Sequence, residues 1–573
     1  MMASDGGSVS QELQDTGVLS TAGNGGQYIA ARPTKEIEKM GEVTATTKNE
    51  VGGPIHSYKG FSDDMTCYGG FQYEENKSYE SRTAKACAKG FHACENPLFC
   101  LGHKPPYRSL YHEVIQDGTI DKCDDKTAST KITIGRRLYG TDMAKAALCY
   151  IRKNIKSSVE YNGADAQSQF TEVSSDATNK FVIAAQPDSV AVVPEHTYKR
   201  KTVLATEDGS AAVVENGTAC ISVAMEKHSV SIADGLYNAS IAAGMHSVSA
   251  ASGMKSVAVA PSICSMADAD GLQNVSVVTS EYSAASVRGG GSVSASVNRN
   301  TKSAADGISC IAANTGDNST VASDGDYSIS VSTGDDGKSK AKGNRCASVV
   351  TSRYSASTSD GENSVAASTG VYGTVTANGK RSTAVSTGVY GTASEYGDNG
   401  VSASTHTNSK SSACGKRVVS VTTGGSGTST ANGDYSVSAS TGGGSVSVTD
   451  GNHCIAAAAG KESAVKVNGG VAVATGENSV SIANGNFSMA VAAGERTNAV
   501  AGEMSIAAAI GDNSTAEGKI GSWLVLVQRE IQRRDGMLEW FVKDVRAFYV
   551  DGTDIKPDTK YFLWNGEAVE AER

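Results

Sequence analysis

Large side chains are scarce in this chain of 573 residues. Aromatic residues make up only 6% of it, Trp occurs three times and Pro nine times, and apolar residues amount to 39%. A single compact core stops growing at roughly 250–300 residues, so the length predicts several structural units. The shortage of aromatics predicts that much of the chain buries small side chains in a thin core. A charged fraction of 20% excludes a charge-rich disordered chain.

Several other features are missing, and each excludes a class of protein. No stretch approaches ~18 consecutive apolar residues, so no transmembrane helix is expected. The first 30 residues lack a basic region followed by an apolar run, so no secretory signal is expected. The net charge is −10, whereas proteins that bind nucleic acids usually carry an excess of basic residues. The charge therefore argues against a nucleic-acid partner. Residues 373–380 have the wrong spacing for a phosphate-binding Walker loop.

Glycine, in contrast, is abundant and regularly spaced. Steps of nine from Gly217 to Gly469 visit 29 positions, and 23 of them are Gly. A fixed period of this kind is typical of a solenoid. The unit is a Gly-containing turn followed by about five alternating residues, as in Gly433 to Thr441, which predicts a short strand.

The alternation of side chains predicts a true period of eighteen. With the Gly counted as position one, positions five and seven of every second unit are apolar apart from Thr383, whereas many of the intervening units carry Lys or Thr there. We therefore expect one strand of each coil to bury positions five and seven and the next to bury six and eight. The predicted fold is mainly β, a two-sheet β-solenoid of nine-residue repeats. Val437 should stack on Ile455, with Ala403, Val421 and Ala439 in one inward column.

The ends of the chain have a more ordinary composition. All three tryptophans, Trp523, Trp540 and Trp564, lie in the last 51 residues. Turn-forming Asp-Gly or Asn-Gly pairs at 535–536, 551–552 and 565–566 separate or follow the strand-like runs there. The sequence predicts a C-terminal β-meander cap in which the three tryptophans share one core.

The predicted organisation has five parts. They are a flexible segment at 1–50, a small α+β domain at 51–140, a helix (Asp142 to Ile155) and linker at 141–205, solenoid repeats at 206–519, and the cap at 520–573.

Two stretches carry family resemblances. Gly90 to Pro97, with the sequence GFHACENP, and Asp124 to Thr127 resemble an uncharacterised domain family common in phage and prophage proteins, for which no activity is established. Repeats such as Gly361 to Ala367 resemble the heads of trimeric autotransporter adhesins. The nine-residue spacing is also similar to calcium-binding RTX rolls, but the Asp ligand is replaced by Ser429, so no calcium is expected.

Candidate functional residues concentrate in the N-terminal domain. His92, Cys94, Glu95 and Glu113 form its candidate functional surface. A metal site would use the cysteines and histidines that cluster there, but their spacing departs from zinc patterns, so we expect no metal. The twelve cysteines are expected to be reduced thiols, and no cofactor is expected. The cluster comprises Cys87, His92, Cys94, Cys100, His103 and His112.

These features predict a non-enzymatic, elongated structural or attachment protein, with the solenoid as a spacer between two end domains. The resemblance implies a phage or prophage origin, a place in the cytoplasm of the bacterial host or on the virion, and other virion proteins or cell-surface glycans as partners. One alternative is an effector enzyme similar to ADP-ribosyltransferases in residues 57–140, with Glu113 as its acid. Another is glycan or ice binding by a solenoid face. The sequence leaves oligomerisation open.

Overall fold

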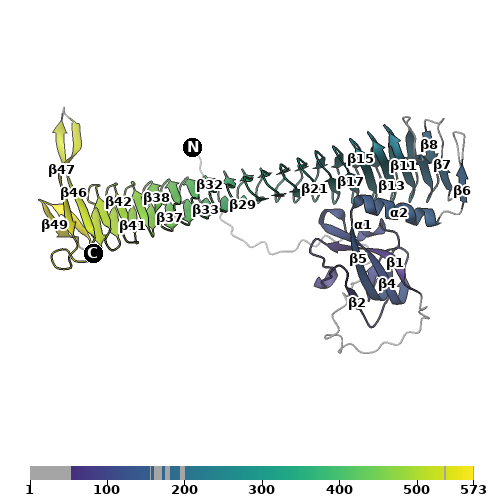
Figure 1. The fold of residues 1–573 in the computed structure, drawn as a ribbon, viewed down its shortest axis with the longest axis horizontal. Coiled ribbons are helices and arrows are strands. Elements are labelled where there is room, and N and C mark those ends of the chain that lie inside the picture. Colours follow the sequence, from purple (N-terminus) through teal and green to yellow (C-terminus); the bar gives the residue numbers. More distant parts are fainter. Residues whose placement is uncertain are drawn as a thin grey trace, which may run out of the picture.

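The structure is a computed structural model, and it describes residues 53–154, 157–160, 171–174, 181–193, 201–534 and 537–571. The chain forms a long rod with a small domain against one flank and a projecting arm at the far end (Figure 1). It is mainly β, with 53% strand and 5% helix, and the rod is a two-sheet β-solenoid of about 19 turns of ~18 residues. The predicted fold class is confirmed. The segment expected to be flexible, 1–50, lies outside the described residues.

One long sheet, here the even sheet, forms one wall of the rod, and its strands pair in parallel up to β46, which pairs antiparallel with β47. Its strands are β8 (Phe181–Ala184), β10 (Thr202–Ala205), β12 (Ile221–Ala224), β14 (Ala239–Ala242), β16 (Val257–Ala260), β18 (Val275–Val278), β20 (Val293–Ser296), β22 (Ile311–Asn314), β24 (Ile329–Ser332), β26 (Ala347–Val350), β28 (Val365–Ser368), β30 (Thr383–Ser386), β32 (Val401–Thr405), β34 (Val419–Thr423), β36 (Val437–Thr441), β38 (Cys454–Ala459), β40 (Gly470–Ala474), β42 (Met489–Ala492), β44 (Ile506–Ala509), β46 (Trp523–Arg534) and β47 (Met537–Tyr549).

The odd sheet forms the opposite wall, again parallel until the antiparallel strands β48 and β49 close it. Its strands are β6 (Ser157–Glu160), β7 (Thr171–Ser174), β9 (Val190–Val193), β11 (Ala211–Thr218), β13 (Val230–Leu236), β15 (Val248–Met254), β17 (Met266–Asp270), β19 (Ala284–Arg288), β21 (Lys302–Asp306), β23 (Thr320–Asp324), β25 (Lys338–Lys342), β27 (Ala356–Asp360), β29 (Thr374–Asn378), β31 (Thr392–Tyr396), β33 (Lys410–Cys414), β35 (Thr428–Asn432), β37 (Val446–Asp450), β39 (Ala464–Val467), β41 (Val480–Ala483), β43 (Asn498–Ala501), β45 (Thr515–Gly518), β48 (Tyr561–Trp564) and β49 (Glu567–Glu570).

The predicted stacking of residues eighteen apart is confirmed. Val437 of β36 pairs with Ile455 of β38. Three tyrosines at one turn position, Tyr354, Tyr372 and Tyr390, stack with ring centroids 5.1 and 4.9 Å apart. Each nine-residue unit therefore crosses from one sheet to the other, and each coil returns to the same sheet.

The predicted inward column is wrong. Ala403, Val421 and Ala439 do form one column, but they lie on the outer face of the even sheet and are half-buried. Both strands of a coil bury positions six and eight, for example Ser438 in β36 and Ser429 in β35. The expectation assumed that the larger apolar residues fill the core, whereas the interior is filled by Ser and Ala.

Many of the buried serines at position six are tolerated in this core because their hydroxyl groups bond to one another, whereas the hydroxyl groups of Ser332 and Ser440 at position eight have no hydrogen-bond partner in the described chain. Ser438 Oγ donates to Ser429 Oγ at 3.0 Å, and Ser429 Oγ donates to Ser420 Oγ at 2.9 Å. The chain of hydroxyls thus passes from sheet to sheet every nine residues. Burial of a polar group costs little when the group is hydrogen-bonded, so small hydroxyl residues can occupy the narrow space between the sheets.

Glycine begins each unit because successive coils approach closely at the turn. A Cβ on Gly370 would lie 1.8 Å from the carbonyl oxygen of Ser352 in the preceding coil, and Gly343 adopts φ +122°. Glycine meets such close contacts and positive φ values at the lowest cost, although Asn298 and His406 occupy equivalent positions with positive φ. This explains the nine-residue glycine spacing.

The N-terminal domain is an antiparallel sheet with two helices. The sheet order is β1-β4-β5-β2, and β3 also pairs with β5. The elements are β1 (Ile55–Ser62), a 3₁₀ turn at Tyr68–Gly70, β2 (Ser78–Glu80), β3 (Phe91–Ala93), α1 (Phe99–His103), a second 3₁₀ turn at Pro106–Arg108, β4 (Ser109–Lys122), β5 (Thr127–Leu138) and α2 (Gly140–Asn154).

Helix α2 joins this domain to the rod. It packs on the outer face of β13, β15 and β17, and its buried residues Met143, Ala147 and Ile151 belong to one cluster with rod residues such as Val230 and Val248. Figure 1 shows the domain beside the first coils, on the flank of the rod. The strands under α2 are therefore buried on both faces.

The predicted tryptophan core of the cap is wrong. Trp523, Trp540 and Trp564 are 47%, 51% and 58% exposed. The last coils are instead closed by a cluster of aliphatic residues and one tyrosine, because β46 continues the even sheet as a further rung and its inward residues face the rod interior. This cluster includes Leu524, Leu526, Val550, Ile555, Tyr561 and Leu563.

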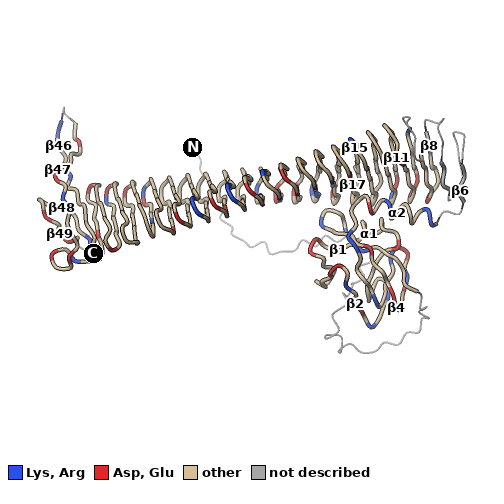
Figure 2. The backbone as a smooth tube through the Cα atoms, viewed as in Figure 1, with Lys and Arg blue, Asp and Glu red and all other residues tan. Residues whose placement is uncertain are grey.

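Two further observations concern the surface. In the part of the chain that the structure describes, no helix is long and apolar enough to cross a membrane. Figure 2 shows acidic and basic residues interspersed along the rod and on the N-terminal domain, without an extended block of one sign.

Candidate functional site

A pocket of about 230 Å³ opens in the N-terminal domain between β1, β3, α1 and the 3₁₀ turn at Tyr68–Gly70. Its wall is cationic and aromatic, and no Asp or Glu is among the residues that line it. The charged and ring-bearing residues of the wall are Lys59, Lys104, Lys126, His92, His103, Tyr58, Tyr68 and Tyr73.

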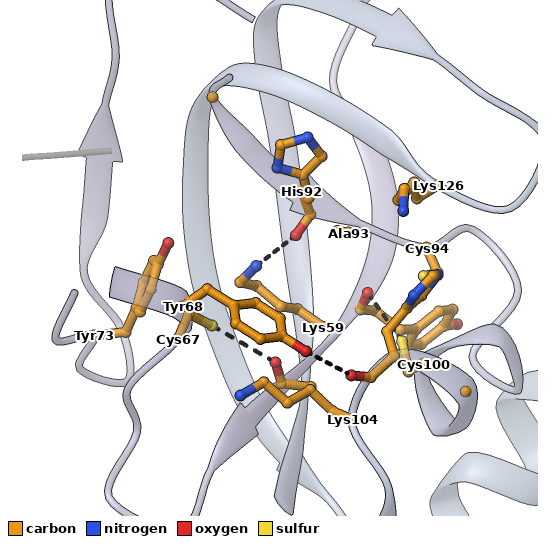
Figure 3. Close-up of a pocket in the computed structure, with 15 residues that line it drawn as sticks. Lys59, Cys67, Tyr68, Tyr73, His92, Ala93, Cys94, Cys100, Lys104 and Lys126 are labelled. Atoms are coloured by element: carbon orange, nitrogen blue, oxygen red, sulfur yellow. Dashed lines mark hydrogen bonds between the residues drawn. The ribbon is translucent and has the colours of Figure 1, made fainter. Parts of the chain in front are cut away.

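Lys59 is one of two buried lysines in this wall, and Lys126 is buried to the same extent. Lys59 lies on β1 between Ser57 and Phe61, on the face of the strand that is buried, and only 9% of it is exposed. Its ammonium group donates to the carbonyl oxygen of His92 at 2.6 Å and lies 5.6 Å from the ring centres of Phe61 and Tyr73. A positive charge is thus held at the base of the pocket (Figure 3).

The two histidines of the wall are neutral at pH 7. Burial lowers the pKa of His92 to about 4, and the neighbouring Lys59 and Lys126 add to the shift. Burial also lowers the pKa of His103, against the opposing effect of Asp125, whose Oδ2 lies 2.7 Å from Nε2 of His103. The charge of the pocket therefore comes from its lysines.

Lys104 and Tyr68 lie at the opening. The ammonium group of Lys104 is 4.7 Å from the centre of the Tyr68 ring and donates to Ser62 Oγ at 3.0 Å. Tyr68 is 57% exposed, and its hydroxyl donates to the carbonyl oxygen of His103 at 3.4 Å. Figure 3 shows the Tyr68 ring between Lys59 and Lys104.

Two of the predicted surface residues reach the pocket and two do not. His92 and Cys94 line it. Glu95 forms an ion pair with Lys122 at 2.7 Å, and Glu113 forms one with Arg136 at 2.9 Å. Neither glutamate is among the lining residues, so the acid of the enzymatic alternative lies outside this pocket.

The cysteines of the predicted cluster have separate surroundings. Cys100 Sγ donates to the carbonyl oxygen of Tyr58 at 3.3 Å, and a hydrogen bond with Cys94, together with burial, raises the pKa of the Cys100 thiol. Cys87 contacts Cys123 with 3.7 Å between the sulfur atoms. All twelve cysteines are free, and among the described residues no group of three His, Cys, Asp or Glu side chains could hold a metal ion.

The lysines and tyrosines of the pocket were missed by the sequence reasoning, which concentrated on His, Cys and Glu. One signal was present for Lys59. In β1 the buried positions alternate, and Lys59 falls two residues before Phe61, so period-two alternation places a lysine on the apolar face. Lys104 and Lys126 come from other parts of the domain, and only the fold brings them here.

Comparison with known proteins yields one family match. Residues 55–146 match a domain of unknown function (DUF7666). No curated protein and no solved structure matches the chain.

Proposed function

We propose that this protein is a non-enzymatic, elongated structural or attachment protein that works as an assembly of several copies packed along their rods. The outer face of the even sheet carries this proposal. Its outward positions five and seven are apolar along the rod except at Thr202 and Thr383. Members such as Ile311, Ile329, Val401 and Ile455 are 37–47% exposed.

The opposite wall offers a comparison within the same molecule. At the equivalent outward positions from β25 to β35, the odd sheet carries polar residues such as Lys340, Thr376 and Thr430. Nearer the C-terminal end its outward positions include Val448 and Ile482, so the contrast between the walls is clearest in the middle of the rod. Contiguous apolar patches of more than a few hundred Å² on a protein mark interaction sites. The outward side chains of the two sheets therefore differ in polarity, although both sheets are built from the same repeat. This difference supports a partner that binds the outer face of the even sheet.

A second copy of the chain is the partner that this face fits best. Apolar side chains of this face recur once per coil over about 19 turns. A second copy of the chain has the same spacing, so its side chains can match this face along the whole rod. At ~4.8 Å per rung and ~3.3 Å per residue, a strip four residues wide covers on the order of 1,200 Å². A standard stable interface buries about 800 Å² per partner.

The C-terminal arm, defined as β46 and β47, supports the same proposal. It continues the even sheet and extends beyond the rod (Figure 1). Its exposed residues include Ile531, Leu538 and Trp540, which are 51–71% exposed. An isolated two-stranded hairpin is marginally stable in water at best, so an arm with apolar residues on its surface gains stability from a neighbouring copy.

The test is the oligomeric state of the full chain, measured by light scattering coupled to size exclusion. The expected result is a defined oligomer that Val331→Lys with Val421→Lys converts to monomers. The matched control is Thr358→Lys with Thr430→Lys on the odd sheet, where Lys340 and Lys466 already occupy equivalent positions. Wild-type protein that is monomeric at micromolar concentration contradicts the proposal, as does equal dissociation by both pairs of substitutions.

The resemblance of residues 90–97 to a phage-associated domain supports a phage or prophage origin for such an assembly. In a phage or prophage, a bundle of rods would space the N-terminal domain from the arm, with virion proteins or cell-surface glycans as partners.

A further inference from the structure

The pocket in the N-terminal domain has a chemistry that the rod does not explain. Lys59 is the key residue, because a buried ammonium group is costly unless an opposite charge offsets it. Its hydrogen bond and its ring contacts are to the His92 carbonyl, Phe61 and Tyr73. None of these is an anion, and the residues that line the pocket include no carboxylate.

Two further lysines line the same space. Lys104 lies against the ring of Tyr68, and Lys126 lies on the side of His92 and Cys94 (Figure 3). Asp125, which contacts His103 at 2.7 Å, is not a lining residue. The three lysines thus line one pocket from β1, from the segment after α1 and from the segment before β5, and no carboxylate is among the lining residues.

We propose that this pocket binds the phosphate group of a small phosphorylated molecule. A phosphate monoester carries a charge of about −1.5 to −2 at pH 7, which suits three cations better than the single charge of a carboxylate does. Lysine binds phosphate as a point charge and needs no fixed fork geometry. Lys59 and Lys126, each 9% exposed, supply buried contacts, and Lys104 supplies a third.

The remainder of the pocket determines what else the ligand carries. The exposed ring of Tyr68 offers a flat surface beside the lysines, and such a ring favours a sugar or planar ring over a flexible chain. The space of about 230 Å³ corresponds to roughly seven or eight water molecules at ~30 Å³ each. A monophosphate with a sugar and one planar ring system is of this order, whereas a nucleic-acid strand is not.

The experiment is calorimetric titration of the full chain with inorganic phosphate and adenosine 5′-monophosphate. Adenosine and glutamate are the uncharged and carboxylate comparisons. Both phosphates should bind, adenosine should not, and glutamate should bind more weakly. Lys59→Met should weaken phosphate binding at least about tenfold without lowering the melting temperature of the domain, since it removes a buried charge. A merely structural Lys59 would instead lower the melting temperature.

Two variants keep the test decisive. Lys104→Met should also weaken phosphate binding. This variant replaces Lys59→Met in the binding test if Lys59→Met does not fold. Lys77→Met, at an exposed lysine of the same domain that pairs with Glu74, should bind like the wild type. Absence of binding by both phosphates, equal binding by wild type, Lys59→Met and Lys104→Met, or glutamate binding as tight as phosphate overturns the proposal.

Discussion

The backbone N–H of Thr141, at the start of α2, donates a hydrogen bond of 2.7 Å to Oδ2 of Asp268 in the rod. The two residues are 127 positions apart, and Asp268 is fully buried. Nη2 of Arg288 lies 3.0 Å from the same carboxylate oxygen and donates to the Thr141 hydroxyl at 2.6 Å. A carboxylate of β17 therefore caps the helix that attaches the N-terminal domain.

Asp268→Ala should loosen the N-terminal domain from the rod. The substitution removes the cap of α2 and leaves Arg288, a largely buried cation, without this partner, and breaking a buried pair costs about 3–5 kcal/mol. Hydrogen exchange of α2 amides should rise strongly. The control is Asp270→Ala, since Asp270 is half exposed and lies 3.5 Å from Arg288, where a pair contributes about 0–1 kcal/mol. Similar exchange in both variants contradicts this role for Asp268.

Glu395→Gln should stabilise the rod at neutral and alkaline pH. Glu395 lies in the core between Ala377 and Ala413. Neither of its carboxyl oxygens has a hydrogen-bond partner in the described chain. Burial, helped by Asp398, raises its pKa from 4.5 to about 8. The folded state therefore holds a proton that the unfolded state releases, and stability falls as pH rises from about 4.5 to 8, by at most about 1.4 kcal/mol per pH unit.

Thermal melts from pH 4 to pH 9 provide the measurement. The melting temperatures of wild type and Glu395→Gln should coincide near pH 4, diverge up to pH 8 and stay apart by a constant amount above it. Parallel curves over the whole range would exclude ionisation of Glu395 as the cause.

The N-terminal domain should lose stability between pH 7 and pH 5. Burial lowers the pKa of His92 to about 4 and also lowers those of His103 and His112. The unfolded chain binds protons near pH 6.5, and the folded domain does so only at lower pH, so acid favours unfolding. Hydrogen exchange of β3 and β4 at the two pH values measures this. His92→Gln should reduce the difference, and a domain equally protected at both pH values refutes the prediction.

Closure of the rod should depend on the aliphatic cluster and not on the tryptophans. Leu524→Ala removes a fully buried side chain and should cost about 2–5 kcal/mol, whereas Trp564→Ala, at a residue that is 58% exposed, should change stability by about 0.5 kcal/mol or less. Denaturation of the two variants tests this difference.

Truncation after residue 519 should have a further effect. It removes β46 to β49, so the last strands would offer unpaired edges to other chains. End-to-end association, seen by light scattering, is expected. A truncated chain that keeps the size and heat resistance of the full protein shows that these strands do not protect the end.

The sequence by itself determined the period and the number of sheets. Gly370 and its equivalents recur every nine residues because a Cβ there would overlap the preceding coil. The contact itself lies between coils, but it repeats at every turn, so its period can be read from the glycine spacing. The hairpin turn at Asn565 and Gly566, both with positive φ, was likewise predictable from the residue pair.

Only the tertiary structure decided which face of each strand is buried. Ser438 is polar and Val437 apolar, and pattern reasoning therefore placed Val437 inside. The serine lies inside because it bonds to Ser429 across the narrow space between the sheets, a contact invisible in one strand. The pocket is also a product of the fold, because Lys59, Lys104 and Lys126 come from three segments, and long-range packing alone places their charges around one space.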